Sequence, residues 1–225
     1  MQFSNIRNLL IIDTSTKNAT VAISKESKIV WSNFWKSKNN HSVELMDNIK
    51  DSLVATAISI KDLDCIAVAT GPGGFSSIRV GVSVALGLAN PNDTLLLGVP
   101  TFEIEFEKFR SLEKYKKLVS LIPAGLNAFC WKSYDDNNLR SPDGIVIREE
   151  IYSKFEKGTF FCGEELKPIF ENYKNFKYSD RSHRDPEDII KIINRAIDED
   201  AISKYRDFSP IYSRSPNINS KKERD

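Results

Sequence analysis

The order of apolar runs along the first half of the chain constrains the fold more than any other feature of the sequence. Three runs rich in Val, Ile and aromatic residues follow one another with only a few turn-forming residues between them, at residues 8–13, 19–24 and 28–35. Such closely spaced runs predict three strands in an antiparallel meander. Helical and strand-like segments then alternate, at residues 41–57, 64–73, 75–89, 94–101 and 102–115. The predicted order is therefore β-β-β-α-β-α-β-α.

The second half of the chain repeats this order in a weaker form. Two runs resemble the first hairpin, and they are followed by a short strand, a short helix and another strand, at residues 117–125, 127–135, 144–147, 148–158 and 159–163. The longest helix is predicted at residues 185–206, with Asp185 as its N-cap and Pro186 at its first position.

Two β-β-β-α-β units in tandem predict an α/β protein made of two ribonuclease-H-like lobes, the architecture of actin, sugar kinases and Hsp70. A single doubly wound sheet is the alternative, but the opening meander fits it poorly. We assign residues 1–101 to an N-terminal lobe, residues 102–212 to a divergent, degenerate C-terminal lobe, and residues 213–225 to a polar tail.

Composition leaves the function open but narrows the class of protein. The formal net charge of +1 over 225 residues creates no strong field that would favour nucleic acid over other partners. The apolar run near the start is too short for a signal peptide, and no run is long enough to span a membrane, so we expect a cytoplasmic protein. Cys65, Cys130 and Cys162 are expected to be buried, reduced thiols.

Asp13 and the turn that follows it are the first candidates for chemistry. In a working member of this fold, such an aspartate holds a metal-bound water, and the turn hydroxyls and amides hold phosphate. The candidate nucleotide contacts, as remnants of such a site, are Asp13, Thr14, Ser15, Gly71, Gly73 and Gly74. The alternative interpretation is a hydrogen-bonded turn closing a hairpin, with a Gly/Pro turn between a strand and a helix.

Two absences in the sequence argue against catalysis. In the second half, the segment "SLIPAGLNAFC" corresponds to "IIDTSTKNATV", so "IPA" stands where Asp13 stood and the second lobe lacks the matching carboxylate. His41 and His183 are the two histidines, and they form no HxxxH or HExxH pair. We therefore predict no catalytic residues and no metal site.

The two helices of the first half carry the pattern of a protein interface. Small residues recur every four positions from Ser77 through Gly81 to Ala85, which forms a ridge that a second helix can approach closely. The helix at residues 41–57 is apolar over nearly half of its circumference, more than one contact face needs. The candidate partner-facing residues are His41, Leu45, Met46, Ile49, Leu53, Ser77, Gly81 and Ala85. The alternative is a helix buried on two sides within a monomer.

Several segments together resemble the TsaB (YeaZ) family. They run in order from residue 9 to residue 218 and include "LLIIDTSTKNATVAI", "HSVELM", "IPAGLNAFCW" and "PIYSRSPNI", with "GPGGFSSIRVG" as the most specific piece. The resemblance implies an actin/Hsp70-like fold that lost its own catalysis and supports a paralogue, TsaD. TsaD makes N6-threonylcarbamoyladenosine at position 37 of tRNAs reading ANN codons, with the small ATPase TsaE assisting in bacteria. TsaD has a metal-binding HxxxH helix, whereas the matching helix here has His41 followed by Leu45.

We therefore expect a non-catalytic subunit that stabilises and positions a TsaD-like transferase. The resemblance implies pairing of the two helices with their TsaD counterparts, a TsaE-like ATPase as a further partner, and a homodimer when the protein is alone. We expect tRNA contact only through the complex, no membrane contact, and no cofactor of its own, with ATP or ADP bound at the interface with partners. The alternatives are an independent nucleotide-dependent kinase or ATPase that uses Asp13 and the glycine turn, and a homodimeric scaffold.

Overall fold

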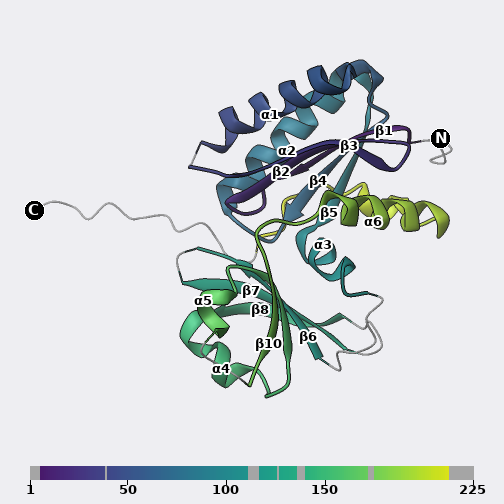
Figure 1. Ribbon diagram of the computed structural model, residues 1–225. Helices are drawn as coiled ribbons and strands as arrows, with labels where there is room; N and C mark the ends of the chain where they lie inside the picture. Colours follow the sequence, from purple (N-terminus) through teal and green to yellow (C-terminus); the bar gives the residue numbers. More distant parts are fainter. Residues whose placement is uncertain are drawn as a thin grey trace, which may run out of the picture.

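The computed structural model describes residues 6–38, 40–110, 117–125, 127–135, 140–171 and 175–212. The chain forms two lobes, each built on one mixed five-stranded sheet, with a cleft between them (Figure 1). The predicted tandem architecture is confirmed, and the opening meander is its most regular part.

The first sheet has the strand order β3-β2-β1-β4-β5. Its strands are β1 (Asn8–Asp13), β2 (Asn18–Lys25), β3 (Lys28–Lys36), β4 (Cys65–Gly71) and β5 (Leu95–Pro100). The meander of β1 to β3 is antiparallel, whereas β4 pairs parallel with β1 and β5 pairs parallel with β4. Because β1 and β4 are buried on both faces, both strands are almost entirely apolar.

The second sheet repeats this topology in the order β10-β9-β6-β7-β8. Its strands are β6 (Lys117–Pro123), β7 (Ala128–Asp135), β8 (Arg140–Ile147), β9 (Phe160–Glu164) and β10 (Lys177–Arg181). The repeat is therefore more complete than the sequence predicted, because β10 and the short helix before it were missed. Both are only a few residues long and lack a clear apolar period.

Helices cover both faces of the first sheet. Helices α1 (His41–Thr56) and α2 (Phe75–Ala89) lie on one face, and α6 (Pro186–Asp198) lies on the other (Figure 1). Helix α3 (Thr101–Glu107) lies at the junction of the lobes, and α4 (Ile151–Lys154) and α5 (Lys167–Phe170) pack on the second sheet. Short 3₁₀ turns occupy Ile60–Asp62, Asn90–Asn92, Arg148–Glu150 and Ile202–Tyr205.

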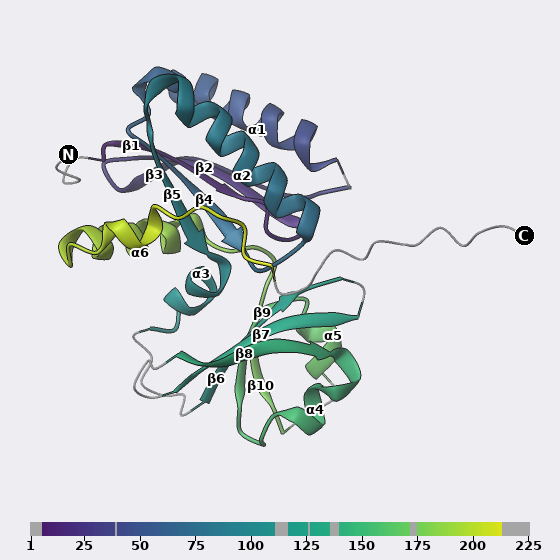
Figure 2. The same ribbon diagram turned by 180° about the vertical axis from the view of Figure 1, so that it is seen from behind.

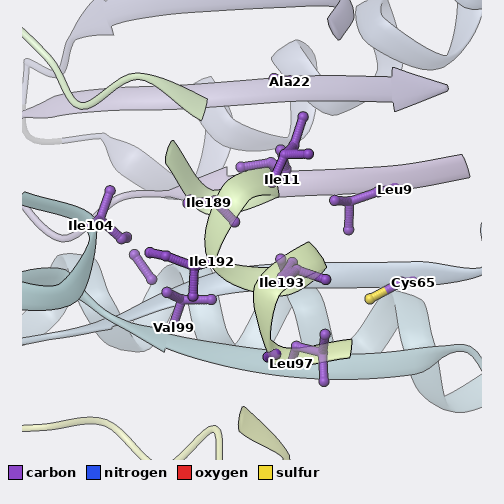
Figure 3. Close-up of a cluster of buried hydrophobic side chains, with 14 of the residues drawn as sticks. Leu9, Ile11, Ala22, Cys65, Leu97, Val99, Ile104, Ile189, Ile192 and Ile193 are labelled. Atoms are coloured by element: carbon purple, nitrogen blue, oxygen red, sulfur yellow. The ribbon is translucent and has the colours of Figure 1, made fainter. Parts of the chain in front are cut away.

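Helix α6 belongs to the core of the first lobe, although its sequence falls in the range expected for the second. Asp185 caps the helix by accepting a hydrogen bond from the Glu187 amide, and Pro186 opens it, as predicted. Its isoleucines pack against the face of the sheet formed by β1, β4 and β5 (Figure 3). The assignment of all of residues 102–212 to the second lobe is therefore corrected, because the first sheet has a second apolar face that this helix covers.

Two predicted helices are shorter than expected. Helix α6 ends at Asp198 and gives way to a 3₁₀ turn, so the longest helix of the described residues is α1. Helix α3 ends at Glu107, and part of the range predicted for it, residues 111–115, lies outside the described residues. The predicted polar tail, residues 213–225, also lies outside them.

The three cysteines are free and buried, as predicted. Burial raises the pKa of the Cys65 thiol and raises that of Cys162 to about 12, so neither is a reactive thiolate near neutral pH. In the part of the chain that the structure describes, no helix has both the length and the apolar character needed to cross a bilayer.

Candidate functional site

The candidate site lies where the two lobes meet. Asp13 is the last residue of β1, and the turn that follows it points toward the end of β9, where Glu164 is the last residue. Both carboxylates are buried, and the Thr16 hydroxyl donates a hydrogen bond to Glu164 at 2.8 Å. Because the two strand ends belong to different sheets, this contact links the lobes directly.

Arg184 occupies the centre of this junction with a side chain that is 1% exposed. The residue follows β10 and precedes α6. Its guanidinium has five N–H donors. All five are used, by Asp13 Oδ2 at 2.6 Å, Glu105 Oε1 at 3.3 Å, Glu164 Oε1, Ser15 Oγ at 2.9 Å and Thr16 Oγ1 at 3.3 Å. We call Asp13, Glu105, Glu164 and Arg184 the inter-lobe cluster.

The charges of the inter-lobe cluster explain its pKa shifts. Burial raises the pKa of Asp13, but the Arg184 charge and the hydrogen bonds from Arg184 and Ser15 outweigh it and hold the pKa below its usual value. Burial also raises the pKa of Glu164, and there the opposing effect of Arg184 is too weak to reverse the shift. One guanidinium thus faces three carboxylates, and for Glu164 the effect of burial on the pKa outweighs the opposing effect of Arg184.

A second buried arginine extends the polar region away from the cleft. Arg181 lies 3.3 Å from Asp188 and 3.9 Å from Glu105, and Lys191 contacts the other oxygen of Asp188. These ion pairs join β10, α3 and the start of α6. The side chains are therefore paired within the protein and contribute to the junction of the lobes.

Asp13 does not fit the role of holding a metal-bound water. One of its oxygens accepts from Arg184, and the other accepts from the Ser15 amide at 2.9 Å and the Ser15 hydroxyl at 2.6 Å. A cation at the same carboxylate would have to displace a guanidinium that is already bound. Among the described residues, no group of three or more His, Cys, Asp or Glu side chains is arranged to hold a metal ion.

The turn hydroxyls and the glycine loop are also bound within the protein. Thr14 Oγ1 donates to the Ser77 carbonyl at 2.7 Å, and the Gly74 amide donates to the Ser15 carbonyl at 2.7 Å. A Cβ atom on Gly73 would lie closer than 3 Å to that same carbonyl, so only glycine allows the loop to approach the turn. The predicted nucleotide contacts therefore bind one another in this structure, and nucleotide binding stays a prediction.

A cleft of about 700 Å³ remains open beside the inter-lobe cluster. The first lobe contributes Lys17, Asn18 and the start of α2, and the second lobe contributes Pro123, Gly125 and Glu164. Pro123 ends β6 as Asp13 ends β1, so the predicted loss of a carboxylate at this position is confirmed. The second lobe nevertheless supplies a carboxylate from β9, which the sequence comparison of the two halves missed.

The small-residue ridge of α2 faces the interior, which corrects its assignment as a partner surface. Ser77, Gly81 and Ala85 are all buried, and a Cβ atom on Gly81 would lie closer than 3 Å to Thr14 Oγ1. The ridge lets the helix approach the protein's own β1–β2 turn and β4. The physical reason for small residues was therefore correct, but the close neighbour is this chain's own sheet.

The residues predicted on α1 divide between interior and surface. Leu45 and Ile49 are buried in the core beneath the helix, Leu53 is half-buried, and Met46 is 45% exposed. His41 begins the helix as expected, but its side chain lies outside the described residues. Of the eight predicted partner-facing residues, Met46 is therefore the one whose described side chain is clearly exposed.

A different set of residues forms the outer surface of the two helices. On α1 the exposed apolar side chains are Val43 at 53%, Met46 and Val54 at 73%, and on α2 Leu86 is 44% exposed. Arg79 and Gly87 are also exposed on α2, and nothing lies within 4 Å of the place where a Gly87 side chain would begin. We call Val43, Met46, Val54, Arg79, Leu86 and Gly87 the outer face.

Sequence reasoning missed Arg184, Glu105 and Glu164. Glu164 had a signal, because a carboxylate ends the apolar run "TFFCGE" as Asp13 ends "NLLIID". Arg184 had none, because it lies in a polar loop and its partners come from residues 20 to 171 positions away. The sequence around Glu105 predicts a surface position on an amphipathic helix, but the residue is fully buried.

Comparison with known proteins gives consistent matches. The sequence model of the family described as "TsaD: tRNA N6-adenosine threonylcarbamoyltransferase" matches residues 35–159. The chain is 27% identical over 194 residues to the tRNA threonylcarbamoyladenosine biosynthesis protein TsaB of Buchnera aphidicola subsp. Schizaphis graminum, a match that covers 82% of this chain and 92% of that protein.

Solved structures match the fold. A Pseudomonas aeruginosa protein with similarity to peptidase YeaZ superimposes with a TM-score of 0.71 at 19% identity, over 92% of this chain and 100% of that one. A Bacteroides thetaiotaomicron protein of unknown function with an actin-like ATPase fold gives 0.52 at 8% identity, over 83% and 96%. The architecture is therefore that of the actin-like ATPases, with two ribonuclease-H-like lobes.

Proposed function

Because the chain belongs to the TsaD family, in its TsaB (YeaZ) branch of tRNA threonylcarbamoyladenosine biosynthesis proteins, we propose that it is a non-catalytic subunit of a threonylcarbamoyltransferase complex. In this proposal it stabilises and positions a TsaD-like catalytic subunit. The transfer of the threonylcarbamoyl group takes place on the partner. This chain contributes a rigid two-lobed body and a binding surface.

The observation that carries the proposal is the position of Arg184. In a catalytic member of the fold, Asp13 and the adjoining turn would face a bound cation and phosphate. Here the Arg184 guanidinium binds Asp13, Ser15 and Thr16 together. Separating the partners of a buried ion pair leaves uncompensated buried charges and destabilises the protein strongly. We therefore expect Arg184 to stay bound to Asp13 under ordinary conditions.

The outer face supports a binding role for α1 and α2. Exposed Met and Val side chains on α1 lie beside an α2 surface that carries leucine and glycine. Exposed apolar side chains gathered on neighbouring elements are typical of protein interfaces. We propose this face as the contact with the TsaD-like subunit and, when that subunit is absent, with a second copy of this chain. A TsaE-like ATPase joins the complex, any ATP or ADP binds at the interface with partners, and tRNA is bound only through the assembled complex.

Reconstitution tests the proposal. The purified chain alone should neither hydrolyse ATP above background nor modify tRNA. Addition of the TsaD-like subunit from the same cell, with its other components, should give threonylcarbamoyladenosine, and omission of this chain should abolish it. Metal-dependent ATP turnover by the chain alone, lost in Asp13→Ala, would contradict the proposal.

An independent nucleotide-dependent enzyme is the second candidate, and the open cleft favours it. The cleft volume of about 700 Å³ suits a small-molecule ligand, and its lining brings the exposed Lys17 together with the carboxylates of Glu164 and Glu165. Calorimetry of the isolated chain with Mg–ATP decides between the candidates. We expect weak binding, and a dissociation constant below the micromolar range would favour the second candidate.

A further inference from the structure

The segment that follows α6 crosses the first lobe from β5 to α2. After the 3₁₀ turn Ile202–Tyr205, residues 207–212 pass beside β5 and β4 toward the inter-lobe side (Figure 2). The Ile211 amide donates to the Thr70 carbonyl at 2.7 Å, and a side chain on Gly71 would collide with the Ile211 carbonyl. We call residues 207–212 the C-terminal strap. The strap contains the start of "PIYSRSPNI", one of the segments that resemble the TsaB family. The proposed function gives this segment no role.

Tyr212, the last residue of the strap, holds an arginine of the outer face. Arg79 Nε donates to the Tyr212 hydroxyl at 2.7 Å. The Arg79 guanidinium lies 3.9 Å from the centre of the Phe75 ring and 5.2 Å from that of Tyr212, and the two rings are 4.7 Å apart. Two aromatic rings and one hydrogen bond therefore fix a side chain that would otherwise be mobile on an exposed helix.

This arrangement leaves the binding edge of the guanidinium free. Within the described part of the chain, Arg79 donates through Nε alone, and no hydrogen bond or ion pair uses Nη1 or Nη2. A planar guanidinium offers two parallel donors that match a carboxylate or a phosphate. Because its rotamer is already fixed, binding such a group costs less conformational entropy than binding to a free arginine.

We propose that Arg79 is a partner-binding residue that takes a carboxylate of the TsaD-like subunit, and that Tyr212 is its positioning residue. The inference rests on the proposed function, because it assigns a specific contact to the outer face. The C-terminal strap then has a role in assembly: it carries the tyrosine that pre-organises the arginine.

The exposed residues of α1 and α2 taken together favour a protein carboxylate over a nucleic-acid phosphate as the partner of Arg79. On the neighbouring helix α1, Asp47 and Asp51 are exposed, and Lys50 is the exposed cation between them. A phosphate backbone laid across both helices would meet two carboxylates and one cation on α1, and the apolar side chains Met46 and Leu86 would stay uncovered. A partner helix with an acidic residue opposite Arg79 satisfies both requirements.

Substitution of Arg79 in the full chain tests the inference. We expect Arg79→Met to weaken binding to the TsaD-like subunit at least tenfold, to flatten the salt dependence of that binding, and to leave the melting temperature nearly unchanged. Arg79→Lys keeps the charge but not the two-donor edge, and should recover only part of the affinity. The matched control is Arg110→Met, because Arg110 also lies over an aromatic ring but projects from the end of α3.

Tyr212 variants test the positioning role. Tyr212→Ala should weaken binding about threefold to tenfold in the wild-type background and have no further effect in Arg79→Met, since the tyrosine acts through the arginine. Tyr212→Phe, which keeps the ring and loses the hydrogen bond, should lie between wild type and Tyr212→Ala. Additive effects of Tyr212→Ala and Arg79→Met would overturn this role.

The remaining outcomes separate the inference from the proposed function. Wild-type affinity in Arg79→Met, or a loss of tRNA binding with unchanged affinity for the protein partner, would overturn the inference and leave the proposed function standing. If Arg79→Met fails to fold, wild-type affinity in Arg79→Lys would still overturn it. A wild-type chain that does not bind the TsaD-like subunit at all would overturn both.

Discussion

The inter-lobe cluster and the outer face differ in how completely their polar groups are hydrogen-bonded and their apolar groups are buried within the chain. In the cluster, all five N–H donors of Arg184 have acceptors, although this is where a catalytic relative would hold its ligand. On the outer face, by contrast, Val54 is 73% exposed and the Nη atoms of Arg79 lack partners among the described residues. In the function proposed above, binding therefore takes place on the helices and not in the cleft.

This difference concerns energy as well as position. The Arg184 guanidinium joins the end of β1 to the end of β9 through Asp13 and Glu164, and removing it would leave buried charges without a partner. Exposed apolar side chains on two helices lose contact with water only when a partner covers them. This burial stabilises a complex by roughly 25 cal/mol per Å² of apolar surface. Under the proposed function, the inter-lobe cluster contributes to the folded chain alone, whereas the outer face gains free energy only through association.

The largest expected effect comes from removing the cation of the inter-lobe cluster. Arg184→Met should lower the free energy of unfolding by about 3–5 kcal/mol, because it leaves Asp13, Glu105 and Glu164 buried without their counter-charge. Arg79→Met is the matched control on the outer face and should change stability by less than about 0.5 kcal/mol. Urea denaturation of both variants measures the difference, and equal stabilities would show that the cluster does not hold the lobes together.

Two glycines of α2 test which side of the helix faces the protein. Gly81→Leu should destabilise the chain by roughly 1–3 kcal/mol or more, since its side chain would enter the space of Thr14 and Val68. The assignment of Gly81 to a partner-facing ridge implied a folded variant that fails to bind its partner, and the buried position of Gly81 reverses that expectation. Gly87→Leu should instead leave the melting temperature unchanged or slightly raised, because glycine costs a helix about 1 kcal/mol relative to alanine.

For Gly87→Leu, the measurement of the melting temperature is followed by an assay of binding to the TsaD-like subunit. We expect weaker association with the TsaD-like subunit, because a leucine would hold the partner helix away from α2. A stable Gly81→Leu together with an unstable Gly87→Leu would mean that α2 is rotated relative to the structure described above.

A charge on the outer face should affect association and not folding. Met46→Glu places a carboxylate among exposed apolar side chains, and we expect at least a tenfold loss of affinity for the TsaD-like subunit and for a second copy of the chain. Sedimentation measures the homodimer, and copurification measures the heterodimer. Leu45→Glu is the contrasting variant, because Leu45 is fully buried one position earlier and its substitution should unfold the protein.

The smallest expected effect is a pH dependence that arises from Glu164. Burial raises the pKa of Glu164 in the folded protein, Arg184 opposes the shift, and Glu105 reinforces it. As pH falls through that raised pKa toward the usual range near 4.5, the folded chain takes up a proton before the unfolded chain does, so this group adds stability on acidification. Asp13 acts in the opposite sense, since its pKa is lowered and its contribution is lost only below about 3.9.

Comparison of wild type with Glu164→Gln isolates this dependence. Unfolding free energies at pH 7.5 and pH 5 should show a relative gain on acidification in wild type that is absent in the variant. Titrating groups outside the inter-lobe cluster are shared by the two proteins and cancel in the difference. A variant whose pH dependence matches that of wild type would show that Glu164 keeps an ordinary pKa.

The sequence alone determined the elements whose signals are local. The meander, α1, α2 and the Asp185 cap were predicted because alternation, helical periodicity and capping chemistry each act within a few residues. The loss of a carboxylate at the end of β6 also followed from the comparison of the two halves. Family membership followed from motifs such as "GPGGFSSIRVG", which can be recognised without any knowledge of their contacts.

Only the tertiary structure decided which side of each element faces inward and which distant charges meet. A ridge of small residues on α2 requires a close neighbour, but its spacing is the same whether that neighbour is a partner helix or the protein's own Thr14. Arg184 finds Asp13 across 171 positions of sequence, and α6 returns to a sheet formed by the other half of the chain. These pairings depend on chain topology and on the balance between desolvation and Coulomb attraction, neither of which leaves a pattern in neighbouring residues.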